Sequence, residues 1–406
     1  MSDLAFAIRP AAPCHATLDF NTAIARMATV TAPLGQERGA LADAAGRILA
    51  RPVLARLDSP RADLAAMDGY AVCGAQGARL KIVGASFPAR PFRGAIGPGE
   101  AVRIFTGAPM PDGADRVIAQ ELAMRHGDEV AIPAAKGGRH VRPRASDFAA
   151  GAPLLSAGRR LDARAMLVAA AADAATLTLW RQPRVFILAT GDELSRPGLA
   201  SGGALSIPDS TSLAIAALAT EWGATITGMA LVPDDSDMIE ARAKAAMAEA
   251  DILIVTGGAS VGDRDFSRDA LGALGLDRVF AGVAIKPGKP VWYGQAGGMQ
   301  VLGLPGNPTA ALVTARLFLA PLLCLLSGRQ AGAALGWRPA ALGAPVGEAG
   351  NRESFLCGDW DGITVRALDR QAASSQASLA STNVLIRRGR DAPAEPAGAT
   401  AMILDF

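Results

Sequence analysis

Four glycine-bearing polar loops carry the residue types that anion and metal chemistry needs. Each loop follows an apolar, strand-like run, and the loops cover residues 190–194, 256–265, 286–290 and 304–308. Their glycines let backbone N–H groups approach an oxyanion, and Lys286 and Lys289 add fixed positive charge. Hard oxygen ligands for a metal come from acids in the first two loops: Asp192, Glu193, Asp263 and Asp265. Lysines combined with carboxylates suggest a metal-assisted reaction on an anion.

The loop at 256–265 is the most specific of the four. It holds three glycines, a serine and two aspartates within ten residues, which is more than a simple turn needs. We interpret it as a cradle for a phosphate or a pterin, built from Gly257, Gly258, Ser260 and Gly262. Residues 258–262 also match Gly-x-Ser-x-Gly, but an irregular loop follows where a hydrolase elbow needs a helix, so we treat this match as accidental.

The other three loops are weaker signals. The acids at 192–193 could instead cap a helix N-terminus, and the lysine turn at 286–290 could be a solvated surface turn. The loop with Pro305, Gly306, Asn307 and Pro308 precedes an apolar helix, whose free N–H groups and positive dipole end would face the same crevice.

Several common motifs do not fit. Gly282 and Gly288 are one residue too far apart for a P-loop, and Pro290 stands where Ser or Thr should hold magnesium. A dinucleotide fold is not supported, because no Gly-x-Gly-x-x-Gly follows a strand. The three histidines lack the spacing of zinc ligands.

Alternating strands and helices must position these loops. Strand-like runs over 184–189, 225–231 and 251–255 alternate with helical runs over 210–222 and 237–250, with an N-cap at Asp235. This alternation predicts a parallel, three-layer α/β domain. The C-terminal ends of parallel strands gather on one sheet edge, so the loops should meet there as a binding crevice.

The rest of the chain divides into segments that differ in the spacing of their apolar residues. Residues 17–50 show helix-like spacing, 51–151 carry short apolar bursts between Pro and Gly, 161–175 form an alanine-rich helix, and short strand-like bursts return after Gly328. We predict a helical linker domain (1–50 and 152–180), an inserted β-rich domain (51–151), an α/β domain (181–328) and a C-terminal β domain (329–406).

Composition narrows the class of protein. Apolar residues make up 50% and charged residues 19% of 406 residues, which is typical of globular domains. A net charge of +2 does not indicate the strongly basic surface that binds nucleic acid. The four cysteines lie far apart and predict reduced thiols in a cytoplasm, and the first 13 residues lack the apolar core of a signal peptide. The apolar run at 317–326 is short for a membrane span and predicts a buried helix.

Taken in order, seven motifs resemble the molybdopterin molybdenumtransferase family, which includes bacterial MoeA and the C-terminal domain of gephyrin. They are Ala-Met-Asp-Gly-Tyr-Ala at 66–71, Thr-Gly-Ala-Pro at 106–109, Gly-Ala-Asp at 113–115, Thr-Gly-Asp-Glu-Leu at 190–194, Gly-Gly-Ala-Ser-Val-Gly at 257–262, Lys-Pro-Gly-Lys-Pro at 286–290 and Gly-Leu-Pro-Gly-Asn-Pro at 303–308. The resemblance implies insertion of molybdate into adenylylated molybdopterin with release of AMP, assisted by a divalent cation, usually magnesium.

The resemblance also implies roles for particular residues. Catalytic positions fall on Asp63, Thr106, Asp147, Glu193, Asp265, Lys286 and Lys289. Ligand-binding positions fall on Gly257, Gly258, Ser260, Gly262, Pro305, Gly306, Asn307 and Pro308. Carboxylates at Glu193, Asp234 (or Asp235) and Asp265 would hold the metal, while the lysines hold phosphates.

The family further implies an elongated cytoplasmic homodimer whose active site uses both subunits, with a molybdopterin adenylyltransferase and client molybdoenzymes as further partners. The chain departs from the family pattern at Leu64, Ala65, Gly282, Cys357 and Ala373, where polar or charged residues are usual. The leading hypothesis is the transferase. The alternative is a non-catalytic or specialised paralogue that binds molybdopterin or the finished cofactor and delivers it to a molybdoenzyme.

Overall fold

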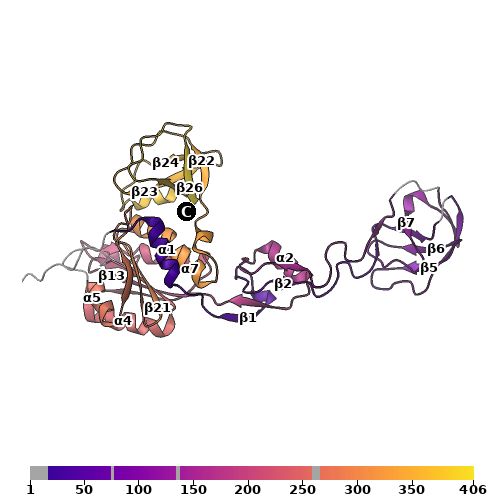
Figure 1. The fold of residues 1–406 in the computed structure, drawn as a ribbon, viewed down its shortest axis with the longest axis horizontal. Helices are drawn as coiled ribbons and strands as arrows, with labels where there is room; N and C mark the ends of the chain where they lie inside the picture. The colour runs from indigo at the N-terminus through magenta and orange to yellow at the C-terminus, as the bar shows by residue number, and fades with distance from the viewer. Residues whose placement is uncertain (1–16, 75–76, 134–137, 258–265) are drawn as a thin grey trace, which may run out of the picture. The chain divides into compact units, whose positions relative to one another are not determined.

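The computed structural model describes residues 17–74, 77–133, 138–257 and 266–406. It forms two compact units, a smaller one of residues 38–179 and a larger one of residues 1–37 and 180–406 (Figure 1). The prediction that residues 1–13 are not a signal peptide lies outside the described residues. So do the predicted roles of Gly258, Ser260, Gly262 and Asp265.

A six-stranded sheet forms the centre of the larger unit. Its order is β16 (Thr225–Val232), β13 (Arg184–Thr190), β17 (Ile252–Thr256), β21 (Met299–Leu304), β20 (Trp292–Ala296) and β18 (Asp277–Ala281). The first four strands run parallel, and β20 pairs antiparallel with both β21 and β18, so that β20 runs against the other five strands. The predicted parallel α/β core is therefore confirmed, and two antiparallel pairings made by β20 extend it.

Helices cover both faces of this sheet. On β13, Val185 and Ile187 join one hydrophobic cluster while Phe186 and Leu188 join the other, because successive side chains of a strand point to opposite faces. The first cluster includes α1 (Phe20–Val30) and α3 (Thr211–Glu221); the second includes α4 (Ser236–Glu249) and α5 (Phe266–Ala273). These two clusters make the three-layer arrangement that the alternation predicts (Figure 1).

A long apolar helix lies within the first layer. It runs from Pro308 to Leu326 through α6 (Pro308–Thr314), a π-helical turn (Ala315–Leu319) and α7 (Ala320–Leu326). By length and composition alone it could cross a membrane, with a mean hydropathy of 2.0, but 94% of it is buried inside the protein. The predicted buried helix at 317–326 is confirmed, and it is the second half of a longer core helix.

The C-terminal segment closes into a small barrel. Its sheet has the order β19 (Ile285–Lys286), β23 (Glu353–Trp360), β24 (Thr364–Ala367), β22 (Arg338–Leu342), β26 (Thr400–Asp405) and β25 (Val384–Arg388). Because β25 also pairs with β23, the last five strands form a closed ring. The predicted barrel-like domain is confirmed. One expectation was wrong: the strand before the lysine loop, β19, pairs with β23 of this sheet and not with the parallel sheet.

The predicted helical region at 17–50 is helical only in its first part. Asp19 caps α1 by accepting the Thr22 N–H at 2.9 Å, and Phe20, Ala23 and Met27 are buried. After Pro33 the chain forms β1 (Gln36–Ala40) and a short 3-10 turn instead. Extended backbone around Gly35 and Gly39 overrides the helix-like spacing of the later leucines. The boundaries of the four domains stay a prediction.

The smaller unit is β-rich, as predicted for residues 51–151. Its main sheet has the order β7 (Arg116–Ala119), β4 (Gly69–Val72), β6 (Glu100–Ile104), β5 (Arg79–Ser86), β9 (Glu129–Ala131) and β8 (Met124–His126). Short pairs join β10 (Val141–Arg142) to β3 (Leu64–Ala65) and β11 (Pro153–Leu155) to β2 (Val53–Leu54). Helix α2 (Ala163–Ala171) and β12 (Thr176–Trp180) share a separate hydrophobic cluster.

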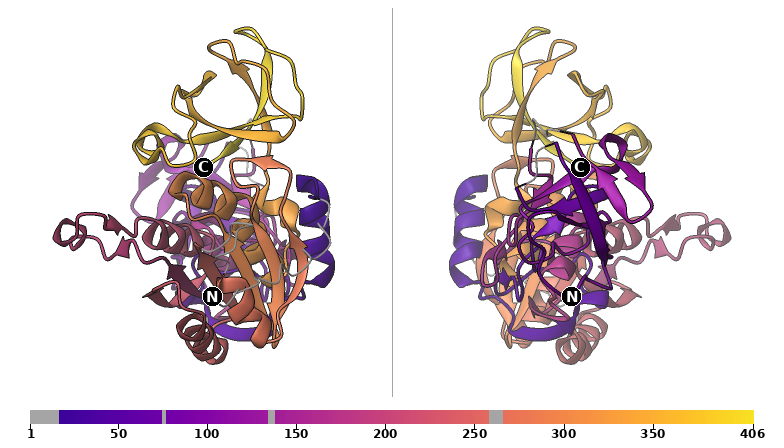
Figure 2. Two further views of the ribbon diagram at one scale, coloured as in Figure 1. Left: turned by 90° about the vertical axis from the view of Figure 1, so that its left-hand side faces the viewer. Right: turned by 90° about the vertical axis from the view of Figure 1, so that its right-hand side faces the viewer.

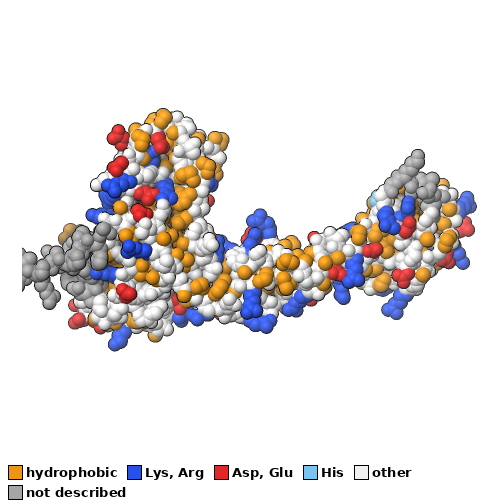
Figure 3. Space-filling view, in the orientation of Figure 1, with side chains coloured by type: hydrophobic (Ala, Val, Ile, Leu, Met, Phe, Trp, Pro, Cys, Tyr) orange, Lys and Arg blue, Asp and Glu red, His pale blue; other side chains and the backbone are white. Residues whose placement is uncertain are grey.

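Charged side chains are mixed on the visible surface. Figure 3 shows lysines and arginines interspersed with aspartates and glutamates on that face of the larger unit. The net charge of +2 is thus distributed over both signs and is not concentrated in one field on this face.

Candidate active site

Three parallel strands end side by side and open into a hollow. Strand β13 ends at Thr190, β17 at Thr256 and β21 at Leu304, and Thr256 pairs in register with both Ala189 and Leu304. The loops that follow line a cavity of about 870 Å³. Its lining brings together these predicted site residues: Glu193, Asp234, Gly257, Pro305, Gly306, Asn307 and Pro308. Loops distant in sequence therefore meet at the sheet edge, as parallel strands require.

Glycines allow these loops to pack backbone to backbone. Gly257 has a φ of +87°, and a Cβ added to it would lie 2.2 Å from the Thr190 carbonyl oxygen and 2.8 Å from Thr190 Oγ1. A Cβ on Gly306 would in turn lie 3.6 Å from the Gly257 Cα. Only glycine fits at position 257, because both the backbone angle and the space exclude a side chain.

Two buried hydroxyl groups in this hollow have no hydrogen-bond partner among the described residues. They are Thr190 Oγ1 and Ser210 Oγ, and both residues line the cavity. Thr190 is only 3% exposed. A buried hydroxyl without a partner costs free energy, so a bound ligand or ordered water is the expected partner.

The chain between β13 and α3 supplies a second wall. After Glu193, β14 (Leu194–Ser195) pairs in parallel with β15 (Ile207–Pro208), and the intervening chain projects from the sheet (Figure 2). Asp209 Oδ1 then accepts the N–H groups of Thr211 and Ser212 at 3.2 and 3.0 Å and so caps α3. The alternative that the acids at 192–193 cap a helix is wrong, because a strand follows them.

The described acids at the crevice differ in their contacts. Asp192 Oδ1 accepts the Asp234 N–H at 3.2 Å, which ties the loop after β13 to the loop after β16. Glu193 is exposed, lines the cavity, and its carboxylate has no hydrogen bond or ion pair with another described residue. Within the described ranges, no three His, Cys, Asp or Glu residues form a metal-ligand group.

A second hollow of about 450 Å³ adjoins the first, since Pro290, Pro305 and Asn307 line both. Lys286, at the end of β19, and Lys289, in the loop that follows, both line it. Ala310, in the first turn of α6, donates its N–H to the Ala373 carbonyl at 3.2 Å. The helix therefore offers fewer free N–H groups to an anion than the sequence led us to expect.

Some lining residues escaped the sequence analysis. Ser374 and Gln376 reach the first hollow, and Arg352 and Gln371 reach the second, all from the C-terminal segment. None lies in a glycine-bearing loop after a parallel strand. The only local signal was the turn chemistry of Ser374 and Ser375, which is common in loops.

In the smaller unit, the predicted residues Asp63, Thr106 and Asp147 lie in three loops beside the six-stranded sheet. Asp63 Oδ1 accepts the Arg144 N–H at 2.8 Å. Thr106 donates both its N–H and its hydroxyl to Asp68 Oδ1, at 2.8 and 2.7 Å. Ser59 Oγ lies 3.4 Å from Asp147 Oδ2, and the Asp147 N–H donates to the Ser59 carbonyl at 2.9 Å.

Asp58 fastens the loop that carries Asp147. One carboxylate oxygen accepts the Ala150 N–H at 2.7 Å, and the other accepts Arg144 Nε at 2.5 Å. These bonds, led by the Ala150 N–H, hold the pKa of the Asp58 carboxyl below its usual value. Thr106 likewise lowers the pKa of Asp68, first through its N–H and then through its hydroxyl.

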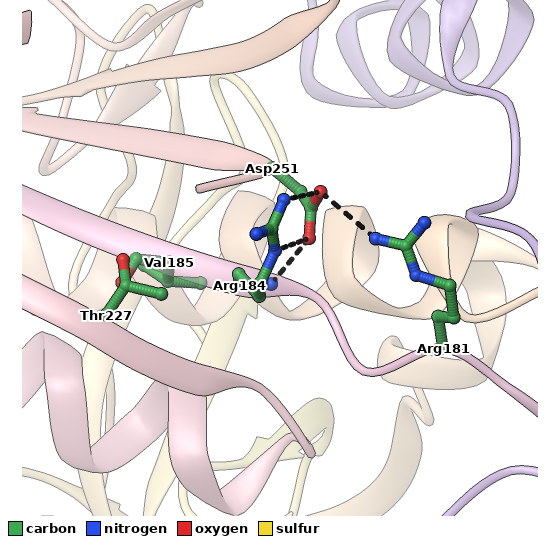
Figure 4. A network of polar contacts seen from close by, with 5 residues as sticks. All are labelled: Arg181, Arg184, Val185, Thr227 and Asp251. Carbon is green, nitrogen blue, oxygen red and sulfur yellow. Dashed lines mark hydrogen bonds and ion pairs between the residues drawn. The ribbon is translucent and has the colours of Figure 1, made fainter. Parts of the chain in front are cut away.

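An ion-pair network holds the N-terminal ends of β13 and β17, at the opposite ends of these strands from the crevice (Figure 4). Asp251, just before β17, binds Arg184 of β13 in a two-pronged pair at 3.0 and 3.2 Å and accepts the Arg184 N–H at 2.9 Å. Arg181 lies 3.7 Å from the same carboxylate. This pair raises the pKa of Arg184 and fixes the starts of β13 and β17, so that their ends reach the crevice in register.

Comparison with known proteins covers most of the chain. A family model of the MoeA N-terminal region (domain I and II) matches residues 18–172, and a model of a probable molybdopterin binding domain matches residues 186–324. A molybdopterin molybdenumtransferase from Nostoc sp. is 36% identical over 369 residues, covering 84% of this chain and 82% of the relative. Molybdopterin molybdenumtransferase 2 from Mycobacterium tuberculosis is 33% identical and covers 93% and 95%.

The fold agrees with these relationships. The crystal structure of the molybdopterin biosynthesis MoeA protein from Pyrococcus horikosii superposes with a TM-score of 0.81 at 27% identity, covering 96% of this chain and 99% of that one. The strand-end loops of the crevice lie inside the segment that matches the molybdopterin binding domain, while Ser374 and Gln376 of its lining come from beyond it. The chain therefore belongs to the MoeA family of molybdopterin molybdenumtransferases.

Proposed function

We propose that this chain is a molybdopterin molybdenumtransferase that inserts molybdate into adenylylated molybdopterin and releases AMP in molybdenum cofactor biosynthesis. The observation that carries this proposal is the strand-edge crevice, whose strand-end loops lie in the segment that matches a molybdopterin binding domain. Its volume of about 870 Å³ suits a ligand of two linked ring systems. Thr190 and Ser210 offer it buried hydroxyls that have no partner among the described residues.

Backbone groups and lysines would bind the substrate's phosphates. Gly257 and Gly306 expose peptide groups at the crevice floor, where no side chain stands between them and a ligand. Lys286 and Lys289 line the adjoining hollow and place positive charge near developing negative charge. Water displaced from the crevice strengthens these interactions.

Magnesium fits the described acids in a particular way. Mg²⁺ usually binds one or two carboxylates together with substrate phosphates. Glu193 and Asp234 both line the crevice and meet that requirement without a cage of three ligands. Bound there, the ion would neutralise charge between the pyrophosphate and molybdate. The third proposed ligand, Asp265, lies outside the described residues.

We also propose that two copies share the active site in the cytoplasm, and that Asp63, Thr106 and Asp147 serve the crevice of the partner subunit. Two inactive variants test this, Glu193→Gln and Asp63→Ala. If the site is shared, co-expression of the two variants should produce mixed dimers that recover part of the wild-type turnover. In such a dimer, one of the two sites contains both Glu193 and Asp63. No recovery in the mixture contradicts a shared site.

The transferase proposal has a direct test. Purified protein, adenylylated molybdopterin, molybdate and Mg²⁺ should yield AMP and an active molybdenum cofactor, and the gene should rescue a strain that lacks the transferase. AMP release should require the metal and fall when EDTA is added. Absence of AMP at saturating substrate rejects the transferase.

A second candidate, a binding and delivery protein without turnover, has one observation in its favour. Cys357 is 3% exposed, and burial raises the pKa of its thiol, so this position supplies no charge to an anion. Tight binding of the cofactor without AMP release, together with failure to rescue the deficient strain, would select this candidate.

A further inference from the structure

We infer that Arg352 directly contacts the oxyanion bound in the hollow beside Lys286 and Lys289, and that it sets the affinity of that hollow. This inference rests on the proposed function. The ligand chemistry is a tetrahedral oxyanion, which is either free molybdate or a phosphate group of the pterin substrate.

Strand pairing places Arg352 beside the lysine loop. Strand β19 pairs in parallel with β23, so that Ile285 lies opposite Glu353 and Lys286 lies opposite Ser354. Arg352 immediately precedes β23, and its Nη1 donates to the Ile285 carbonyl at 3.3 Å. The guanidinium is therefore anchored one residue from Lys286 while most of its N–H groups remain available.

The charge around the hollow is unbalanced. Among the residues that the structure describes, its lining includes Lys286, Lys289 and Arg352 and no aspartate or glutamate. None of these three side chains makes an ion pair with another described residue. Glu353, the neighbouring acid, is already paired with Arg387 at 2.5 Å. Without a counter-charge from a described residue, these three cations repel one another, and a bound oxyanion reduces that repulsion.

The side-chain amide of Gln371, which lines the same hollow, already makes hydrogen bonds within the protein. Gln371 accepts the Cys357 N–H through Oε1 at 2.9 Å, and its Nε2 donates to the carbonyls of Cys357 and Leu368 at 2.8 and 2.7 Å. Both of its donor hydrogens are used, so Gln371 forms a wall and not a ligand. Ala372 and Ala373 add only apolar contact. Side-chain donors for the anion thus come from the two lysines and Arg352.

Arginine differs from lysine in what it recognises. Its planar fork can donate two parallel hydrogen bonds to two oxygens of one tetrahedral anion, whereas lysine acts as a point charge. Lys286 and Lys289 are exposed, while Arg352 is half-buried and anchored by its hydrogen bond to Ile285. We therefore expect Arg352 to fix the anion's orientation as well as its affinity.

Binding of inorganic molybdate to the full chain, measured by calorimetry, tests the inference without turnover. Arg352→Gln should raise the Kd about 10-fold and Arg352→Lys about 3-fold, because the lysine restores charge but not the fork. Arg366→Gln is the matched control: it removes an exposed arginine of the same barrel that lines neither hollow, and should change the Kd less than twofold. Circular dichroism should give the wild-type spectrum for each variant, which checks that the variant is folded.

Parallel titrations with AMP and with inorganic phosphate identify the source of the oxyanion. If Arg352→Gln weakens molybdate binding alone, the hollow takes molybdate; if it weakens AMP or phosphate alone, the hollow takes the substrate's phosphate. Equal affinities of wild type and Arg352→Gln for all three ligands overturn the inference, as does absence of binding by the wild type.

The turnover assay separates this inference from the proposed function. If Arg352 binds molybdate, its loss should raise KM for molybdate while kcat recovers at saturating molybdate, because the lost contact is made in the ground state too. A wild type that releases AMP and an unchanged Arg352→Gln would leave the transferase standing and remove only the role of Arg352. A wild type without turnover rejects the transferase, whatever the molybdate titration shows.

Discussion

The crevice of the larger unit and the loop cluster of the smaller unit use their polar side chains in opposite ways. At the crevice, strand ends fix the loops, and Glu193, Thr190 Oγ1 and Ser210 Oγ have no hydrogen-bond partner among the described residues. In the loop cluster, Asp63 and Asp68 accept hydrogen bonds from the backbone of neighbouring loops. In the crevice, the ends of the sheet's strands position the polar side chains. In the loop cluster, hydrogen bonds from side chains position the loop backbone.

This difference separates two kinds of carboxylate. An acid without an internal partner can be changed with little effect on folding and a large effect on ligand chemistry. An acid that bonds to backbone N–H groups orders its loop, so its loss changes local structure first and activity through it. Motifs alone do not separate the two kinds, because both lie in acidic, glycine-bearing loops.

The sharpest test of the comparison is Glu193→Gln. We expect AMP release to fall about 100-fold or more, because Glu193 is the proposed ligand of the metal ion that would neutralise charge during the reaction. The Tm should stay within about 1 °C of the wild type, since the exposed carboxylate has no internal partner. Glu249→Gln, an exposed glutamate at the end of α4 that lines neither hollow, is the matched control and should change neither quantity. A large drop in Tm for Glu193→Gln would break the comparison.

A smaller effect on activity is expected at Asp68. Asp68→Ala removes the acceptor for both Thr106 donors and should lower kcat/KM about 10-fold by releasing the Thr106 hydroxyl from its fixed orientation. Asp68→Asn keeps a carbonyl acceptor and should retain activity within about threefold. Amide exchange at Thr106 should quicken in the alanine variant only. Equal activity of both variants would show that the orientation of Thr106 does not matter.

The next effect is on stability and its pH dependence. The pKa of Asp58 is lowered in the folded state by the Ala150 N–H and by Arg144, so its contribution is present above the unfolded value of about 3.9 and is lost as pH falls below it. Asp58→Ala should lower the Tm at pH 7 by a few degrees through release of the loop that carries Asp147. Asp58→Asn should flatten the acid limb of the Tm profile. If the Tm profiles of the wild type and of Asp58→Asn have the same acid limb, this assignment is contradicted.

The smallest expected effect is at Ala145, in the same loop. This residue has a φ of +57°, a conformation that costs an L-residue about 1–2 kcal/mol and costs glycine nothing. Ala145→Gly should therefore stabilise the protein by about 0.5 kcal/mol, after subtraction of the greater freedom of glycine in the unfolded chain. Ala149→Gly, where φ is not positive, should destabilise it instead. Urea unfolding measures both, and a destabilised Ala145→Gly variant contradicts the strain.

Much of the candidate site could be predicted from local pattern. The alternation around β13 and β17 predicts buried parallel strands, and parallel strands put Glu193, Gly257 and Gly306 at one edge. Asp235 caps α4 as its sequence indicates, by accepting the Met238 N–H at 2.9 Å. The motif order also identifies the family, because turn residues at fixed spacings are local properties of the chain.

Partner choice escaped prediction where it depends on distant residues. The run before Lys286 is strand-like by composition, but whether it joins the parallel sheet or the barrel depends on β23, which follows it by nearly seventy residues. Arg352, Ser374 and Gln376 reach the two hollows for the same reason. No local period encodes such contacts.

By itself, then, the sequence determined the α/β core, the strand-end loops and the family, because side-chain period and turn chemistry act over a few residues. The sequence also predicted a buried helix at 317–326, but only the tertiary structure showed that this segment is the second half of one core helix at 308–326, which is 94% buried. The tertiary structure alone also showed which acids are committed to loop backbone and which carboxylate stays open to a ligand, because hydrogen-bond partners such as Asp58 and Ala150 lie far apart along the chain.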